Sequence, residues 1–264
     1  MEVQHPTSVD QAVAAMAEGA LALAGGTDLM VEVNFGHARP ENVVALRRIG
    51  ELAEWEPNRI GAGVTWSRLE QGGPLALAQA ARTVGSPQIR NAGTLGGNVG
   101  TASPAGDGLP FLAAVDASIE LVSPAGVRSV PWHEYFVGVK KTARLAGELI
   151  TAIGLPEAMP ERQAFGKIGT RNAMVIATVC CVVTRAQTGV TTVALGSVAP
   201  TPMRARQAEE MISSIDRPSE SDMVEFARLV SEEVRPITDH RSTEEYRRYA
   251  AGILARRLLD RCLR

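Results

Sequence analysis

Two glycine pairs in the sequence carry residue types that could bind the phosphates of a dinucleotide. The first lies in the segment Ala24-Gly25-Gly26-Thr27-Asp28-Leu29 and the second in the segment Thr94-Leu95-Gly96-Gly97-Asn98. A turn without Cβ atoms lets backbone amides approach an anion closely, and successive amides can form a concave anion site. If the fold brings both turns together, their amides could hold the two phosphates of a dinucleotide. We therefore interpret the two turns as a pyrophosphate clamp.

Polar side chains accompany both turns, and this distinguishes them from simple bends. A single Gly-Gly pair usually marks only a tight bend, which needs no hydroxyl, amide or carboxylate groups around it. Such groups suit phosphate oxygens and the polar edges of ribose and adenine. They are supplied here by Thr27, Asp28, Thr94, Asn98, Thr101, Ser103 and Asp107. The two segments are therefore predicted to be binding turns.

Other motifs for phosphate or metal binding are not supported by the sequence. Gly61-Ala62-Gly63 resembles the start of a dinucleotide-binding fingerprint, but Trp66 stands where the third glycine belongs. The segment Gly166-Lys167-Ile168 lacks the Ser or Thr that a P-loop needs after its lysine. The three cysteines and four histidines have no metal-ligand spacing, so we expect no metal site.

Lys167 stands at the end of a predicted strand, directly before the segment Gly169-Thr170-Arg171. At this place the ammonium group is either a solvated cation or a charge that faces a reduced cofactor. The sequence leaves both interpretations open. Cys180 and Cys181, in contrast, point to opposite faces of an apolar strand, where packing explains them.

The elements that position the turns follow from hydrophobic spacing and from capping residues. A helix is expected from residue 9, capped by Ser8 and ended at Gly19, and a strand then leads into the first turn. A single long helix is expected to begin at Trp66 and to continue to Ala81. Strands are expected at 20–24, 59–65, 118–122, 127–130 and 148–155, the third and fourth forming a hairpin.

The pattern changes at residues 156–162, which we interpret as a boundary between domains. We predict a first domain over 1–157, with subdomains of about 1–55 and 56–157, and a second over 162–264. The second domain is expected to contain strands at 164–168, 176–184 and 190–198, followed by helices capped by Ser219 and Ser242. The last helix is expected to dock through Tyr246, Tyr249, Ala250, Ile253, Leu254 and Leu258.

Composition excludes several classes of protein. A length of 264 residues with 45% hydrophobic content is typical of a globular chain that can bury two cores. A net charge of −2 gives no electrostatic reason to expect nucleic acid or an anionic membrane as a partner. The N-terminus lacks the features of a secretion signal, no apolar run could span a bilayer, and the cysteines form no disulfide framework. We therefore expect a cytoplasmic protein whose partner is a small molecule or another protein.

Together with their neighbours, the two turns resemble those of the FAD-binding, or medium, subunit of the molybdenum hydroxylase family, which includes carbon monoxide dehydrogenase and xanthine dehydrogenase. Residues 24–29 are similar to the family's first FAD loop. Residues 85–98, with the continuation through Ser103 and Pro104 to Asp107, are similar to its second. Residues 135–150, 197–205 and 245–248 also resemble the family, so the resemblance covers nearly the whole chain.

The resemblance implies an α+β fold with an FAD-binding domain of the PCMH/vanillyl-alcohol-oxidase type, made of two α/β subdomains. A smaller C-terminal domain of antiparallel sheet plus helices would follow. The cofactor-binding residues that the resemblance implies are Ala24, Gly25, Gly26, Thr27, Asp28, Leu29, Thr94, Gly96, Gly97, Asn98, Thr101, Ser103, Asp107, Leu149, Ile150 and Lys167. Leu149 and Ile150 would pack near the ring edge, and Lys167 would approach the isoalloxazine. Relatives often carry an acidic residue after the counterpart of Arg171, where this sequence has Asn172-Ala173-Met174-Val175-Ile176.

The function that the resemblance implies is electron transfer through bound FAD. The protein would position the cofactor, which supplies the redox chemistry. A molybdopterin-binding large subunit and a 2Fe-2S small subunit would be its partners, and an acceptor such as NAD or quinone would take the electrons. Two alternatives stay open at this point: a self-sufficient FAD-dependent oxidase or reductase, and a flavin-free interaction scaffold with the same fold.

Overall fold

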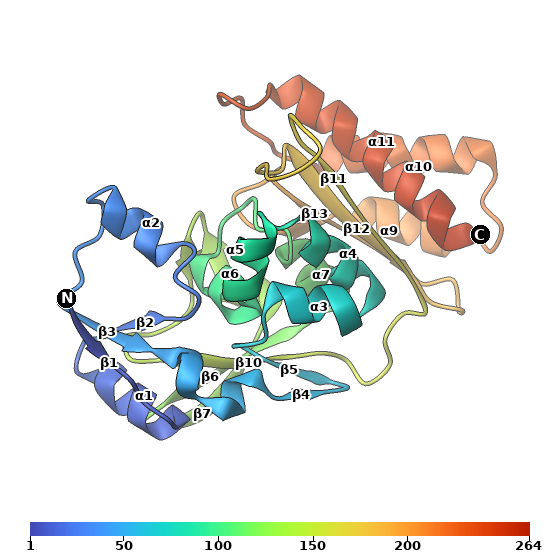
Figure 1. Cartoon of the computed structure of the whole chain (residues 1–264). Helices are drawn as coiled ribbons and strands as arrows, with labels where there is room; N and C mark the ends of the chain where they lie inside the picture. Colours follow the sequence, from blue (N-terminus) through green and yellow to red (C-terminus); the bar gives the residue numbers. More distant parts are fainter.

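The computed structural model describes residues 1–264 and has an α+β fold with four separate sheets (Figure 1). The N-terminal sheet is parallel, with strand order β1-β3-β2. Its strands are β1 (Glu2–Gln4), β2 (Leu21–Leu23) and β3 (Asn42–Ala45). The other elements of this region are α1 (Val9–Ala17), α2 (Leu29–Asn34) and the short 3₁₀ helices η1 (Leu46–Arg48) and η2 (Gly50–Ala53). Ser8 caps α1 through the backbone amide of Gln11, as predicted.

The second sheet is antiparallel and has the strand order β4-β5-β10-β6-β7. Its strands are β4 (Trp55–Glu56), β5 (Arg59–Gly61), β6 (Ser118–Ser123), β7 (Gly126–Pro131) and β10 (Leu149–Gly154). The predicted hairpin is confirmed, since β6 and β7 pair from Ser118 to Pro131. Next to this sheet lie α8 (Trp132–Tyr135) and a small hairpin of β8 (Phe136–Gly138) and β9 (Lys141–Thr142). Because β10 is the central strand, neighbouring strands bond to it on both sides and fix its position.

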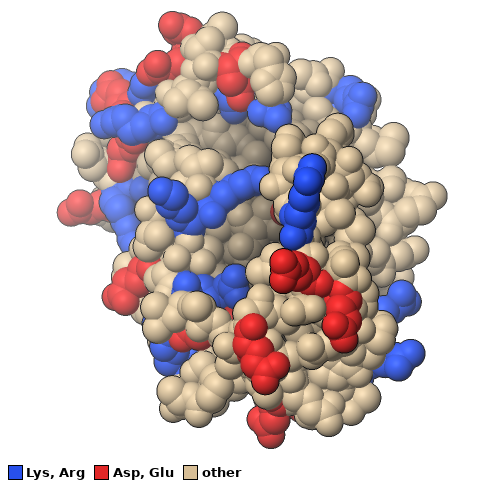
Figure 2. Space-filling view, turned by 90° about the vertical axis from the view of Figure 1, so that its left-hand side faces the viewer, with Lys and Arg blue, Asp and Glu red and all other residues tan.

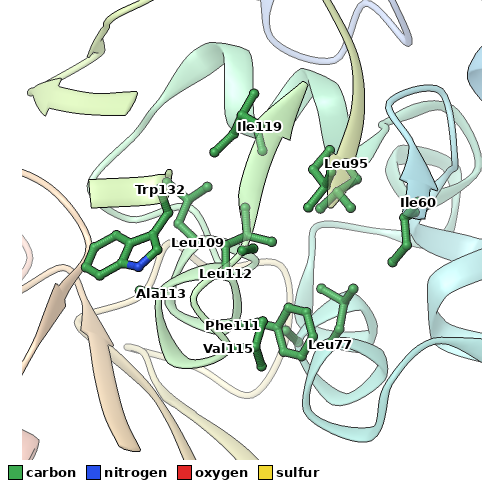
Figure 3. Packing of buried hydrophobic residues seen from close by; sticks show 14 of the residues in the cluster. Ile60, Leu77, Leu95, Leu109, Phe111, Leu112, Ala113, Val115, Ile119 and Trp132 are labelled. Atoms are coloured by element: carbon green, nitrogen blue, oxygen red, sulfur yellow. The ribbon is translucent and has the colours of Figure 1, made fainter. Parts of the chain in front are cut away.

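Five short helices form a layer between this antiparallel sheet and the C-terminal sheet (Figure 1). They are α3 (Trp66–Gly72), α4 (Leu75–Thr83), α5 (Pro87–Ala92), α6 (Leu95–Thr101) and α7 (Leu109–Ala114). Their apolar side chains belong to the largest buried cluster, in which Phe111 of α7 lies beside Leu77 of α4 (Figure 3). The close packing of this layer fixes the positions of the loops at its edge.

The single helix expected from Trp66 to Ala81 is in fact two helices. The chain is extended at Gly73, and Pro74 stands as the N-cap of α4. Proline has no backbone N–H, and its ring disfavours helical geometry in the preceding residue. The prediction of one helix was therefore wrong, because Gly73 and Pro74 separate α3 from α4.

The C-terminal sheet is antiparallel and lies between two groups of helices. Its strands, in order, are β11 (Arg162–Ile168), β12 (Val179–Arg185), β13 (Thr191–Gly196) and β14 (Met203–Arg204). One face packs on α4 and α7, and the other on α9 (Arg206–Ser213) and α11 (Glu244–Leu263), with α10 (Glu220–Glu233) beside α11. Cys180 belongs to the first core and Cys181 to the second. Their interpretation as packing residues on opposite strand faces is confirmed.

The capping box at Ser219 is confirmed, and α11 docks through Ala250 and Leu258 as expected, but two details of this helix were wrong. Its N-cap is Thr243 rather than Ser242, and the side chains of Tyr246 and Tyr249 are exposed. The buried face instead includes Arg247, which is only 3% exposed. A hydrophobic pattern misses this rotation of the helix because it scores arginine as a surface residue. No helix in the structure combines the length and the apolar character needed to cross a bilayer.

Candidate functional site

The two glycine turns meet beside the helical layer. Gly25 lies so close to the chain before α6 that an added Cβ would overlap the carbonyl group of Ala92. At the other end of α6, the Thr101 hydroxyl donates a hydrogen bond to the Asp28 carboxylate over 3.1 Å. The structure therefore brings together two segments that are far apart in the sequence.

The second turn is the first turn of helix α6, not an isolated bend. Thr94 is the N-cap, and its Oγ1 accepts a hydrogen bond from the Gly97 amide over 3.0 Å. The Asn98 amide donates to the Thr94 carbonyl over 3.1 Å. Two amides that could have bound a phosphate are therefore occupied within the helix.

The chain that follows β5 occupies the next two amides of the second turn. Leu95 donates to the Val64 carbonyl over 3.0 Å, and Gly96 donates to the Ala62 carbonyl over 2.8 Å. After Gly61 the Ala62 amide still donates to Thr151 of β10 over 2.9 Å, but the carbonyls of Ala62 and Val64 accept from the second turn, so β5 ends earlier than predicted. The expectation that both turns offer free amides to phosphate was therefore wrong for the second turn.

The first turn has the opposite arrangement. The backbone amides of Gly25, Gly26, Thr27 and Asp28 donate to no backbone carbonyl or side chain of the protein. Gly26 has a φ of +71°, a conformation that glycine adopts without steric cost. Successive free amides next to a glycine of this conformation form an anion-binding concavity. Of the two turns, the first is the one that can offer backbone donors to a phosphate.

Both turns line one cavity of about 1010 Å³. Every residue predicted to bind the cofactor lies in its wall, from Ala24–Leu29 in the first turn to Leu149, Ile150 and Lys167 at the far end. Figure 2 shows a hollow in this side of the molecule, with Lys and Arg side chains beside it; Arg47, Arg144 and Lys167 are the basic residues of the lining. The volume suits a nucleotide-sized ligand. The individual ligand roles stay predictions.

Lys167 and Asp107 form a buried ion pair in the cavity wall. Their side chains are each 7% exposed, and Lys167 Nζ lies 2.5 Å from Asp107 Oδ2. Lys167 also donates to the Thr83 carbonyl over 3.3 Å. Burial raises the pKa of the Asp107 carboxyl above its ordinary value, against the opposing effect of the Lys167 ammonium. The interpretation of Lys167 as a solvated cation was therefore wrong.

Asn98 and Asp107 of the wall each carry one oxygen, Oδ1, that is sealed from solvent and has no hydrogen-bond partner in the protein. Because these oxygens are sealed from the cavity, they do not select a ligand. Gly97 gives the test of whether the site fits a nucleotide. At this wall residue an added Cβ would meet only Thr94 Oγ1, at 3.2 Å, so the bare backbone leaves room for a ligand to approach closely. FAD carries a diphosphate that the free amides of the first turn could bind, so it fits this lining.

Several residues of the wall escaped the sequence analysis because they have no distinctive motif. They are the apolar residues Leu46, Ile49, Leu52, Trp66, Val84, Ile89, Met174, Val175 and Ile176. The glycines Gly61 and Gly63 could have indicated this part of the wall, because an added Cβ at either position would press on the carbonyl of Leu52. These glycines mark a close approach of two chain segments, and Gly63 itself lines the cavity.

Two family profiles match the sequence. Residues 1–158 match the FAD binding domain in molybdopterin dehydrogenase. Residues 164–262 match the CO dehydrogenase flavoprotein C-terminal domain. Together they account for most of the chain.

Individual relatives agree with these profiles. The carbon monoxide dehydrogenase medium chain of Afipia carboxidovorans is 31% identical, over 98% of this chain and 96% of the relative. The nicotinate dehydrogenase FAD-subunit of Eubacterium barkeri is 34% identical, over 72% of this chain and 70% of the relative. Among solved structures, carbon monoxide dehydrogenase from Hydrogenophaga pseudoflava matches 99% of this chain and 96% of its own with a TM-score of 0.90 at 30% identity.

Proposed function

Because the chain belongs to the family of FAD-binding domains found in molybdopterin dehydrogenases, we propose that it passes electrons from an iron–sulfur subunit to a separate acceptor. FAD is its cofactor, and the chain is a subunit of an oxidoreductase. Bound FAD supplies the ability to exchange electrons singly or in pairs. The chain's own residues bind this cofactor, orient it and keep one end of it reachable by partners.

One observation carries the proposal: two remote turns of complementary character line a single nucleotide-sized cavity. The free amides at Gly25–Asp28 would hold the diphosphate, which suits backbone donors and a glycine of positive φ. Asn98 and Asp107, which both lie in the cavity wall, would contact the nucleotide. Leu149 and Ile150, on the central strand β10, would pack against the flavin ring.

The buried Lys167 would place a positive charge near the flavin end of the cofactor. Its ion pair with Asp107 fixes the ammonium group in the wall without exposing it to water. Because the Asp107 carboxylate balances this charge, we propose only that the Lys167 ammonium approaches the isoalloxazine and that Asp107 holds it in position.

The partners are proposed from the relatives, which are called a medium chain and an FAD-subunit of dehydrogenases. A molybdopterin-binding large subunit would oxidise the substrate, and a 2Fe-2S small subunit would deliver the electrons. The acceptor would be NAD or a quinone. We also propose that the chain divides into an FAD-binding domain over 1–157 and a C-terminal domain over 162–264, which the limits of the two matching profiles support.

Reconstitution of the complex tests the proposal. The FAD-loaded chain is reduced chemically and mixed with NAD or a quinone, and flavin absorbance is followed with and without the two partner subunits. We expect reoxidation by one acceptor, and reduction by organic substrate only when both partners are present. Turnover of substrate by the chain alone would favour the self-sufficient oxidase or reductase. Failure to take up FAD would favour the scaffold.

A further inference from the structure

Arg247 of α11 is almost completely buried and makes an unusual set of contacts. Its side chain is 4% exposed. Nη1 donates to two backbone carbonyls, those of Thr178 over 2.7 Å and Ser197 over 3.0 Å. Nη2 lies 2.7 Å from the carboxylate of Asp239, which balances the charge. A planar guanidinium can hold three such acceptors in fixed directions, which an ammonium cannot do.

The first carbonyl, that of Thr178, belongs to the segment that closes one end of the cavity. Met174, Val175 and Ile176, shortly before it, line the wall. The Thr178 amide donates to the Ile168 carbonyl over 2.8 Å, so this residue closes the base of the loop that follows β11. Lys167 directly precedes Ile168. By holding Thr178, Arg247 fixes the loop that carries this part of the wall.

The second carbonyl, that of Ser197, leads to another segment of the wall. The Ser197 amide donates to the Pro104 carbonyl over 2.8 Å. Pro104 lies between Ser103 and Asp107, which both line the cavity. Ser197 has a φ of +65°, a conformation that costs a residue with a side chain about 1–2 kcal/mol. Arg247 therefore fixes a strained residue that in turn holds the second FAD-lining segment.

We propose that Arg247, with Asp239 as its counter-charge, is a positioning residue for the FAD site. Arg247 does not line the cavity itself, but it joins two chain segments that both contribute residues to the wall. The inference rests on the assignment of FAD to this cavity. It adds that the C-terminal domain contributes to cofactor affinity through α11, and that the FAD-binding domain alone would bind FAD less tightly.

Arg185 provides a matched control because it is equally buried in the same domain. It is 4% exposed and donates to Thr191 Oγ1 over 2.6 Å and to the carbonyls of Ile215 and Asp216 over 2.9 and 3.2 Å. None of these residues lines the cavity. Loss of its contacts should affect folding in a similar way without reaching the cofactor.

The experiment compares Arg247→Lys and Arg185→Lys in the full chain. The FAD dissociation constant is measured by flavin fluorescence, the bound flavin by its visible spectrum, and the apoprotein by its unfolding temperature. We expect both variants to unfold at a lower temperature, but only Arg247→Lys to raise the FAD dissociation constant, by about tenfold or more. Its flavin spectrum should also change, since the wall around the ring is displaced.

Equal FAD dissociation constants in the two variants would overturn the proposal. If Arg247→Lys does not fold, Asp239→Asn replaces it: this variant keeps a hydrogen-bond acceptor, and we expect a smaller rise in the dissociation constant. An unchanged value in Asp239→Asn would then overturn the proposal. The FAD dissociation constant of the wild type is measured in the same series. Because this measurement does not depend on electron transfer, a failure of the proposed electron-transfer function would leave the comparison unaffected.

Discussion

The two glycine turns have similar sequences but opposite physical characters. In the second turn, Leu95 and Gly96 are buried and their amides bond to the chain after β5. In the first turn, the amides of Gly25 and Gly26 have no acceptor in the protein. The helix that follows it, α2, buries none of its residues and stands away from the helical layer (Figure 1). The two pairs therefore differ in whether their backbone amides are free, although each pair also has one closely packed glycine, Gly25 in the first and Gly96 in the second.

Apart from the packing of Gly25 against Ala92, few contacts hold the first turn in place before a ligand binds. Asp28 bonds to the Thr101 hydroxyl, and Glu32 of α2 pairs with Lys140 over 3.1 Å where both side chains are substantially exposed. Exposed pairs of this kind contribute little to stability, about 0–1 kcal/mol. The second turn is thus formed with the fold, whereas the first is expected to be completed by FAD.

The largest effect is expected from Gly96→Val in the second turn. A Cβ at this position would lie 2.5 Å from the Ala62 Cβ and 2.7 Å from the Ala62 carbonyl oxygen. Because backbone must move to relieve this overlap, we expect the free energy of unfolding to fall by about 3 kcal/mol. Thermal and denaturant unfolding of the apoprotein measure it. Gly50→Val is the control, since no heavy atom lies within 4 Å of its added Cβ; equal losses in both variants would contradict the packing role.

Gly97→Val should separate ligand contact from packing within the same turn. The added side chain would meet only Thr94 Oγ1 in the protein and would occupy space in the cavity wall. We expect FAD affinity to fall by about a hundredfold or more, with an unfolding temperature of the apoprotein close to that of wild type. Flavin content after purification and fluorescence titration measure this. Unchanged flavin occupancy would count against the assignment of the site.

Thr101→Val weakens the link between the turns without changing side-chain size. It removes the hydroxyl that donates to Asp28. We expect FAD affinity to fall by about fivefold, because about 1 kcal/mol of hydrogen bonding no longer holds the first turn near its bound position. Stability of the apoprotein should fall by no more than about 1 kcal/mol. A loss of stability without a loss of affinity would show that the link serves the fold instead.

A pH dependence is expected from Glu148, which supports the fixed wall at Leu149. Its carboxylate bonds to Arg128 over 2.6 Å, and this bond holds the pKa of Glu148 below its ordinary value of 4.5. A carboxyl with a lowered folded pKa stabilises the protein above its unfolded pKa, and this stability disappears as the pH falls through the folded pKa. We expect Glu148→Gln to lower the unfolding temperature slightly at pH 7 and to flatten its decline below pH 4.5. If the unfolding temperatures of wild type and Glu148→Gln decline equally as the pH falls, this expectation is contradicted.

The sequence predicted what depends on local chemistry and missed what depends on distant partners. The hairpin of β6 and β7 and the cap at Ser219 are set by residues a few positions apart, so pattern analysis found them. Lys167 and its partner Asp107 are remote in sequence, so no local pattern could show that the lysine is buried. The same holds for Arg247, whose partners come from three other segments.

The cavity wall also contains both residues that the sequence predicted and residues that only the fold reveals. The glycines and polar residues that were predicted to bind the cofactor all line the wall, but other wall glycines and polar residues, such as Gly63, Gly106 and Asn91, were not predicted. Apolar residues such as Leu46 and Ile49 look like any core residue until the fold leaves them beside a cavity. Which glycine turn keeps its amides free depends on the pairing of residues 95–96 with residues 62–64, a contact that exists only in the folded chain.

Hydrogen–deuterium exchange at residues 25–28 and 95–98, with and without FAD, tests the contrast between the turns most directly. Without FAD, we expect amides 95–98 to exchange slowly and amides 25–28 to exchange close to the rate of an unfolded chain. Saturating FAD should slow exchange at 25–28 by about a hundredfold and change 95–98 far less. Amides 25–28 that remain fast in the FAD-bound protein, or a larger gain of protection at 95–98, would contradict the account.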